Sequence, residues 1–163
     1  MTKEVVLGNG GVALVSDEDF ERVSRLRWRR WVGPGEIPYV IWRSKKNQRT
    51  VEVRLHRFIL GLKKGEPMVD HANGDTFDNR RDNLRVCTAQ QNIANKKPST
   101  SNKSGFKGVW WRKAKRKWVA SIKISGKQIW LGSYAIKADA ARAYNLAAVK
   151  FFGEFARLNI IAN

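Results

Sequence analysis

The sequence predicts an α+β fold in two parts, and three observations lead to this prediction. Extended runs rich in Val, Ile, Tyr and Trp alternate with a few segments of helical periodicity. A strand, a loop, a strand and a helix follow one another within residues 69–97. After a polar, Ser-rich segment at 98–104, three further strands precede one helix. We therefore expect one domain over 1–97, a linker over 98–104 and a second domain over 105–163.

The composition indicates a soluble, intracellular protein that binds a polyanion. The chain contains 32 basic and 14 acidic residues, which gives a formal net charge of +18. Nucleic acid is the first candidate for such a partner, and an anionic membrane is the second. The N-terminus lacks the apolar region of a signal peptide, and no apolar run is long enough to span a membrane. Because Cys87 is the single cysteine, an internal disulfide and a cysteine-based zinc site are excluded.

The first domain opens with a short apolar strand at 11–15, followed by a helix at 17–26. Ser16 is the expected N-cap of this helix, and the acidic residues that follow it favour the positive end of the helix dipole. Two extended runs at 39–43 and 50–55 are separated by a polar turn. They predict a β-hairpin, so an N-terminal helix and a hairpin precede the polar segment described next.

Residues 69–97 are too rich in Asn, Asp and Arg to form a hydrophobic core. Short strands are expected at 69–71 and 84–87, and the Asn, Gly and Asp residues between them predict a loop. Thr88 is the expected N-cap of a helix at 89–96, because Gln91 completes a capping box. This segment could bring a metal ion, a water molecule and a phosphate together.

The second domain is predicted to contain three strands, at 106–111, 117–124 and 128–133, followed by a helix at 138–152. Alternate residues of the middle strand share an apolar face that should belong to the core, namely Trp118, Ala120, Ile122 and Ile124. The helix carries an apolar stripe formed by Ala140, Ala141, Tyr144, Ala147, Ala148 and Phe151. The pattern predicts a three-stranded antiparallel sheet packed on one helix.

Four polar residues of the first domain have the chemistry to hydrolyse a phosphodiester. Asp70 and Asn92 offer a carboxylate and an amide oxygen, which suit Mg²⁺ because this ion prefers oxygen ligands and keeps several waters. His71 follows Asp70 in a strand, so its side chain leaves the opposite side and is available to take a proton from water. Asn83 could hydrogen-bond across the loop and fix the orientation of the histidine.

These residues resemble a known family. The signature of the HNH endonucleases is similar to Val69-Asp70-His71, Asn73-Gly74-Asp75, DNRRDNLR at 78–85, Thr88 and QNxxN at 91–95. The resemblance covers 12–95 and implies a ββα-metal fold with one divalent ion, Mg²⁺ or Mn²⁺, held by Asp70 and Asn92. It also implies that His71 is the general base and that Asn83 is the structural middle residue. Asn92 stands where the signature has His, as it does in many phage and intron-homing members.

The second domain resembles another known family over residues 104–159. The APETALA/ethylene-response-factor DNA-binding domain is similar to FKGV at 106–109, KWVASI at 117–122, WLG at 130–132, AARAY at 140–144 and LN at 158–159. In that family the sheet enters the DNA major groove with the face opposite the helix. The resemblance and strand parity imply DNA contacts by Lys107, Trp110, Arg112, Lys117, Ser121, Lys123, Gln128 and Trp130. Lys and Trp replace some Arg residues of the plant factors, so their target sequence does not carry over.

Other polar residues near the first site admit two interpretations. The setting of His56 in HRFIL favours a structural role over direct catalysis. Asp75 and Asp78 are more typical of loop-capping groups than of metal ligands. Three arginines form either a solvated face or phosphate contacts, and the adjacent site favours phosphate contacts by Arg80, Arg81 and Arg85.

We therefore predict a metal-dependent DNA endonuclease of homing type from a phage or mobile intron, acting in the cytoplasm of a bacterium or infected cell. The second domain would raise affinity and set the position of the cut, because tethering makes its binding intramolecular. The expected partner is double-stranded DNA, with no membrane and no obligate protein partner. The alternatives are a DNA-binding regulator with an inactive nuclease domain and an RNA-binding protein. The narrow RNA major groove argues against the latter.

Overall fold

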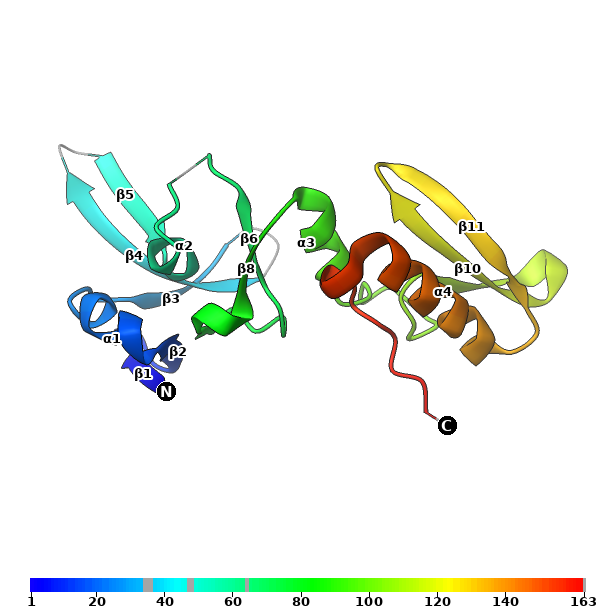
Figure 1. The fold of residues 1–163 in the computed structure, drawn as a ribbon, viewed down its shortest axis with the longest axis horizontal. Helices are drawn as coiled ribbons and strands as arrows, with labels where there is room; N and C mark the ends of the chain where they lie inside the picture. The colour runs from blue at the N-terminus through cyan, green and yellow to red at the C-terminus, as the bar shows by residue number, and fades with distance from the viewer. Residues whose placement is uncertain (34–36, 47–48, 64, 163) are drawn as a thin grey trace. The chain divides into compact units, whose positions relative to one another are not determined.

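The computed structural model describes residues 1–33, 37–46, 49–63 and 65–162, and the chain divides into two compact units (Figure 1). Unit 1 is Met1–Cys87 and unit 2 is Thr88–Asn163. The boundary precedes helix α3 (Ala89–Asn95), which was predicted to belong to the first domain. Among the described residues, no helix is both long and apolar enough to cross a lipid bilayer.

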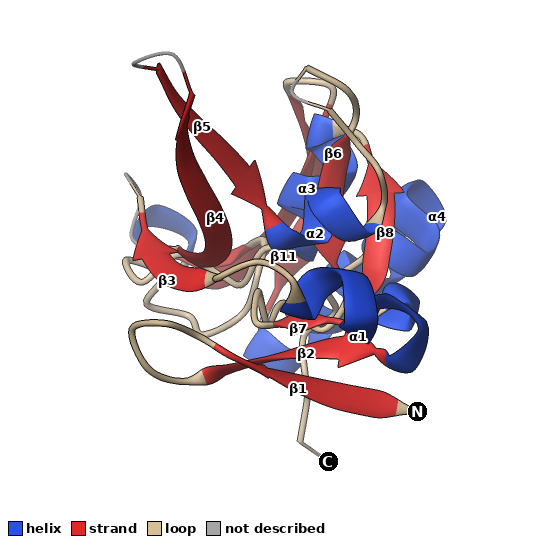
Figure 2. Cartoon of the chain, turned by 90° about the vertical axis from the view of Figure 1, so that its left-hand side faces the viewer, coloured by secondary structure: helices blue, strands red, loops and turns tan. Residues whose placement is uncertain are grey.

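Unit 1 is built from short strands and helices (Figure 2). In chain order they are β1 (Thr2–Val6), β2 (Val12–Ser16), α1 (Asp17–Ser24), β3 (Arg29–Val32), β4 (Pro38–Lys46), β5 (Arg49–Arg54), α2 (Leu55–Ile59), β6 (Met68–His71), β7 (Asp78–Asn79), η1 (Arg81–Asn83) and β8 (Leu84–Cys87). They form two three-stranded sheets of order β1-β2-β7 and β3-β4-β5, and a two-stranded sheet of β6 and β8. The predicted hairpin is present as β4 and β5, and the two strands of the polar segment are present as β6 and β8.

One hydrophobic core holds unit 1 together. Its buried members are Val5, Leu7, Ala13, Val15, Val23, Trp28, Val40, Leu55, Ile59 and Leu84. The indole Nε1 of Trp28 donates to the Val23 carbonyl at 2.8 Å, so the buried ring has its hydrogen bond satisfied. Leu84 pairs with His71 across β6 and β8, and this core residue therefore fixes the position of the polar hairpin.

Helix α1 begins at Asp17 as predicted, but Ser16 does not cap it through its side chain. The Ser16 Oγ accepts a hydrogen bond from the Arg81 backbone N–H at 2.9 Å instead. The helix also ends at Ser24, two residues earlier than predicted, and the chain leaves it toward β3. Ser16 thus ties the start of α1 to the segment before β8, a contact between distant residues that a local capping pattern does not reveal.

Unit 2 consists of α3, a three-stranded sheet and a long helix. After α3 its elements are β9 (Val109–Arg112), η2 (Lys113–Lys115), β10 (Lys117–Ile124), β11 (Lys127–Tyr134), α4 (Lys137–Phe152) and η3 (Gly153–Phe155). The sheet is antiparallel with the order β11-β10-β9, and α4 packs against it through Ala140 and Ala141 on Val109 and Ala120. The predicted three strands and one helix are therefore present.

The stripe of α4 that faces the sheet differs from the prediction at its end. Phe152 is buried, whereas Phe151 is 44% exposed. Phe152 lies two steps of four residues beyond Tyr144, which keeps it on the buried face of the helix. Close packing also explains Gly108, which has a φ of +73°. A Cβ at this position would lie 2.1 Å from the Tyr144 ring, so only glycine permits the approach.

Candidate functional site

The hairpin of β6 and β8 places Asp70 and His71 side by side in the chain with their side chains on opposite faces. Asp70 lies opposite Arg85, and His71 lies opposite Leu84. Both polar side chains are buried, with residue exposures of 6% for Asp70 and 5% for His71. The Asp70 Oδ2 accepts a hydrogen bond from the Arg85 guanidinium in a largely buried ion pair. A carboxylate and an imidazole on adjacent residues are therefore both held away from bulk water.

The His71 ring is oriented by Asn79, a loop residue for which no role was predicted. His71 Nε2 lies 3.3 Å from Asn79 Oδ1. The Asn79 Nδ2 donates to the Thr76 carbonyl at 3.1 Å, so the amide oxygen is directed toward the histidine and accepts from its Nε2–H. This arrangement makes Nδ1 the basic nitrogen of the neutral imidazole. Local sequence carries no signal for this role, because Asn79 is one of several Asn and Asp residues in the loop.

Asn83 hydrogen-bonds across the loop between β6 and β8 through backbone groups of that loop. Its Oδ1 accepts from the Asn73 backbone N–H at 3.0 Å, and its Nδ2 donates to the Asp78 carbonyl at 2.7 Å. The backbone carbonyl of Asn83 also accepts from Ala72 N–H at 2.9 Å. Asn83 therefore fixes the loop that carries Asn79, and it influences His71 through that loop.

Burial lowers the pKa of His71 below its usual value near 6.5, although the Asn79 hydrogen bond and nearby carboxylates such as Asp70 oppose the shift. The imidazole is therefore uncharged at neutral pH, which is the form that can accept a proton. The His56 ring packs edge-on against it, with the ring centroids 5.2 Å apart. His56 is also buried, and burial lowers its pKa to about 3. This packing supports the structural interpretation of His56.

The buried His56 predicts acid sensitivity of unit 1. Below pH 6.5 the unfolded chain protonates this histidine, whereas the folded chain does so only near pH 3. Stability should therefore fall as the pH drops from 6.5 toward 3, by about 2 kcal/mol at pH 5. Hydrogen exchange at the β2 amides would measure this loss. His56→Phe keeps an aromatic ring without the titration, so an equal acid-induced loss in this variant would contradict the assignment to His56.

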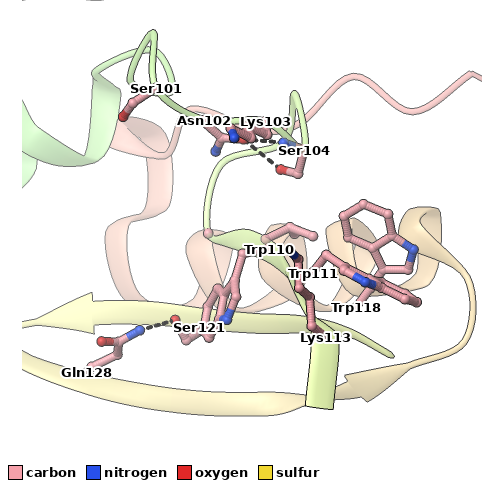
Figure 3. A pocket seen from close by; sticks show the side chains of 12 residues that line it. Ser101, Asn102, Lys103, Ser104, Trp110, Trp111, Lys113, Trp118, Ser121 and Gln128 are labelled. Atoms are coloured by element: carbon pink, nitrogen blue, oxygen red, sulfur yellow. Dashed lines mark hydrogen bonds between the residues drawn. The ribbon is translucent and has the colours of Figure 1, made fainter. Parts of the chain in front are cut away.

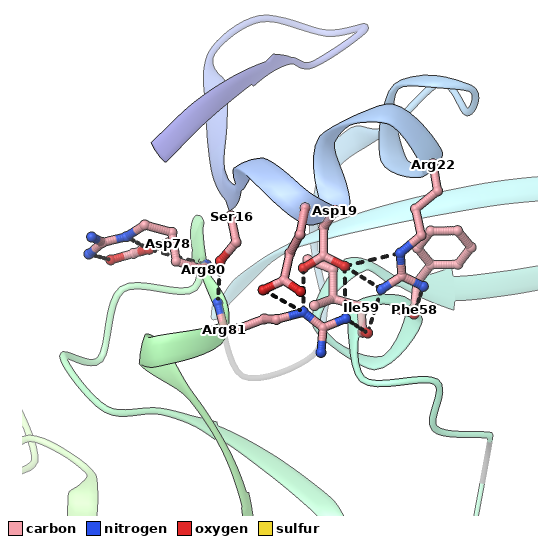
Figure 4. Close-up of polar contacts among 9 residues, drawn as sticks. Ser16, Asp19, Arg22, Phe58, Ile59, Asp78, Arg80 and Arg81 are labelled. Carbon is pink, nitrogen blue, oxygen red and sulfur yellow. Dashed lines mark hydrogen bonds and ion pairs between the residues drawn. The ribbon is translucent and has the colours of Figure 1, made fainter. Parts of the chain in front are cut away.

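The three arginines near the site all bind carboxylates. Arg80 forms two hydrogen bonds of 2.8 Å with Asp78, and Arg85 pairs with Asp70. Arg81 binds the buried Asp19 at 2.7 and 2.9 Å, and Figure 4 shows Arg22 on the same carboxylate. A phosphate would have to share or displace these ion pairs, so phosphate contact by the arginines stays a prediction. Asp78 acts within the loop as expected.

The donors present fit a hard divalent ion in their chemistry. Asp70 supplies a carboxylate on β6, and Asn92 supplies an amide oxygen on α3. The described residues contain no cluster of three or more His, Cys, Asp or Glu side chains that would enclose a metal. An ion that retains most of its waters, such as Mg²⁺, needs only one or two protein ligands. Because Asn92 belongs to unit 2 and Asp70 to unit 1, their joint binding of one ion stays a prediction.

A second candidate site is the sheet face of unit 2 opposite α4. Residues directly opposite each other in antiparallel strands share a face. The register pairs Trp110 with Val119, Arg112 with Lys117, Ser121 with Trp130 and Lys123 with Gln128. The four β10 members of these pairs alternate along one strand, so all eight residues share one face. Val119 is buried within this face. The other seven are Trp110, Arg112, Lys117, Ser121, Lys123, Gln128 and Trp130. This face matches the surface expected to contact DNA, apart from Lys107.

A hollow of about 590 Å³ lies between the segment 101–104 and the sheet, and both faces of the sheet contribute to its lining (Figure 3). Trp110, Ser121 and Gln128 line it, and the Gln128 Nε2 donates to the Ser121 Oγ at 2.7 Å. Trp130 is 52% exposed beside these polar groups. Flat aromatic surfaces next to amide and hydroxyl groups suit the sugars and base edges of a nucleic acid.

The DNA contact expected for Lys107 stays a prediction, and its ammonium has partners within unit 2. The Lys107 ammonium donates to the carbonyls of Ile93, at 3.1 Å, Lys96, at 2.7 Å, and Ala94. Since these contacts hold the ammonium at the end of α3, it does not join the exposed sheet face. The position of Lys107 next to a strand suggested a surface cation, and the sequence had no signal for its contact with α3.

Comparisons with known proteins match both units. A family model described as HNH endonuclease matches residues 53–94, and one described as AP2 domain matches residues 104–154. An uncharacterized HNH endonuclease of Acanthamoeba polyphaga mimivirus is 32% identical over 94% of this chain and 78% of its own length. Protein 3.8 of Escherichia phage T7 is 37% identical over 37% of this chain and 50% of its own length. An AP2-like ethylene-responsive transcription factor of Arabidopsis thaliana is 36% identical over 46% of this chain and 20% of its own length.

Proposed function

Because this chain belongs to the HNH endonuclease family and carries an AP2-like DNA-binding domain, we propose that it is a metal-dependent DNA endonuclease of homing type. The observation that carries the proposal is the buried His71, which follows Asp70 in β6 and whose ring Asn79 orients. Buried, oriented and uncharged, this imidazole has the properties of a general base. Two of the three relatives named above are viral proteins, which supports a phage or mobile-element setting.

In the proposed reaction, His71 takes a proton from the water that attacks the phosphorus. Asn79 holds the ring through Nε2–H, so that Nδ1 receives the proton. Asn83 keeps the loop closed and thereby keeps Asn79 in place. Asp70 and Asn92 would hold the divalent ion, which HNH nucleases generally require. When bound, such an ion stabilises the charge that develops on the phosphate and on the leaving oxygen.

The AP2-like sheet would place this chemistry on duplex DNA. Its exposed face combines Arg112 and Lys123 with Trp130, and the positive charge attracts phosphates while the side chains enter the groove. One catalytic histidine per chain suits the nicking of one strand by a monomer. Cleavage of both strands would need two chains.

Metal removal is the experiment that tests the proposal. Supercoiled DNA that includes the native locus should be nicked with Mg²⁺ or Mn²⁺, and a chelator should abolish nicking without abolishing the band shift of the DNA. The ion is needed for hydrolysis of the phosphodiester, whereas the sheet of unit 2 binds DNA without the ion. A band shift with no cleavage in either metal would favour the alternative of a DNA-binding regulator whose nuclease domain is inactive.

A further inference from the structure

Helix α3 is fastened to the sheet and the C-terminal segment of unit 2. The Gln90 Oε1 accepts hydrogen bonds from the backbone N–H and the hydroxyl of Ser125, each at 3.2 Å, in the turn between β10 and β11. The Ala94 carbonyl accepts from the Arg157 N–H at 3.2 Å, and Ala94 itself is buried. The helix therefore has attachments near its start and near its end, and both lie within unit 2.

Lys107 provides a further attachment, at the end of α3. The last carbonyls of a helix have no partners within the helix, and a cation there also interacts favourably with the helix dipole. The Lys107 ammonium donates to three carbonyls at this end of α3, those of Ile93, Ala94 and Lys96. The Ile93 carbonyl also accepts from the Lys96 N–H, at 3.2 Å. Burial, together with the nearby charge of Arg157, lowers the pKa of Lys107 to about 8. The Lys107 side chain is thus partly shielded from solvent, and its ammonium binds the carbonyls at the end of α3.

The backbone of Lys107 is held from the other side. The Asn159 Oδ1 accepts from the Lys107 N–H at 2.7 Å, and the Asn159 Nδ2 donates to the Lys107 carbonyl at 3.1 Å. Asn145 of α4 binds the backbone of Asn159 in turn, at 2.8 and 2.9 Å. A continuous set of hydrogen bonds therefore runs from α4 through Lys107 to α3.

The segment before Lys107 does not behave as a flexible joint. The Asn102 Oδ1 accepts from the backbone N–H groups of Ser104, at 2.8 Å, and Gly105, at 3.1 Å, while its Nδ2 donates to the Phe106 carbonyl at 2.8 Å. Ser104 is buried. The end of the segment 98–104, which was predicted to be a linker, thus forms a hydrogen-bonded turn from Asn102 to Phe106 within unit 2.

We propose that Lys107 is a positioning residue for DNA cleavage. Its side chain attaches α3, and therefore Asn92, to the DNA-binding sheet. This inference rests on the proposed function, because only a nuclease gives Asn92 a role at the scissile phosphate. The AP2-like domain then does more than raise the local concentration of DNA. The attached helix α3 carries Asn92, one of the two expected metal ligands, so the register of the sheet on DNA also sets the position of that ligand.

The test replaces Lys107 with Met, which keeps the aliphatic stem and removes the ammonium. Hydrogen exchange of the metal-free protein should show α3 amides exchanging about tenfold faster, because the charge-assisted hydrogen bonds are lost. Exchange in β10 and the band shift of DNA in chelator should match the wild type. The saturating single-turnover cleavage rate should fall roughly 10- to 100-fold at an unchanged half-saturating DNA concentration, as expected for a misplaced catalytic group.

Two further variants complete the design. Lys150→Met removes an exposed lysine from α4 and should change neither exchange in α3 nor cleavage, whereas Lys107→Arg should restore part of both. Unchanged exchange in α3 of Lys107→Met would overturn the attachment, and faster exchange with an unchanged cleavage rate would overturn the positioning role. A wild-type protein that cuts no DNA would instead overturn the proposed function, and the exchange data would still decide whether Lys107 holds α3.

Discussion

His71→Ala is expected to lower the rate of DNA cleavage by about three orders of magnitude, which lies within the usual contribution of general-base catalysis. The neutral ring that Asn79 orients would be lost, and alanine cannot take a proton from water. DNA binding should not change, because the sheet of unit 2 supplies it. Single-turnover cleavage of plasmid DNA, together with a band shift in chelator, would separate the two effects.

His56→Phe is the matched control for this prediction. It replaces the other buried histidine with a ring that can keep the edge-on packing against His71. We expect cleavage close to that of the wild type at neutral pH, because His56 serves as packing. If His71→Ala kept most of its cleavage activity while His56→Phe lost it, His56 would be the general base and His71 the packing residue.

The sequence predicts the parts of the fold that depend on local pattern. Alternation of side chains along a strand is a local property, and it correctly placed β10 and the shared face of Trp110, Ser121 and Gln128. The capping box of Thr88 and Gln91 likewise depends on four adjacent residues, and it is present. Asp70 and His71 could be proposed as a pair because strand geometry alone sets their directions.

The contacts that were missed join distant parts of the chain. Asn79 gains its role because β7 pairs in parallel with β2, which brings a loop residue into the unit 1 structure. Lys107 binds α3 because Asn159 fixes its backbone from far along the sequence. Each of these residues is a polar residue within a polar segment, so its sequence neighbours do not indicate its contacts. Their partners decide what they do, and those partners depend on tertiary packing.

Asp70→Ala is expected to remove metal-dependent cleavage and also to lower the free energy of unfolding of unit 1 by about 3 kcal/mol, since it removes one partner of a buried ion pair. The Arg85 guanidinium would lose its carboxylate while its side chain stays mostly buried. Asp70→Asn keeps the size of the side chain and an acceptor oxygen, so it should lose less stability. It should still lose cleavage, because a neutral amide is a poorer ligand for a hard cation.

A double-mutant cycle separates the two roles of Asp70. Adding Arg85→Met to Asp70→Ala removes the charge that the first change left behind, so the double variant should regain part of the lost stability. It should regain no cleavage, because the carboxylate is still missing. Urea unfolding and plasmid nicking measure the two quantities independently. Cleavage by Asp70→Asn at the wild-type rate would exclude Asp70 as a metal ligand, and it would leave the carboxylate with the structural role that its pairing with Arg85 already accounts for.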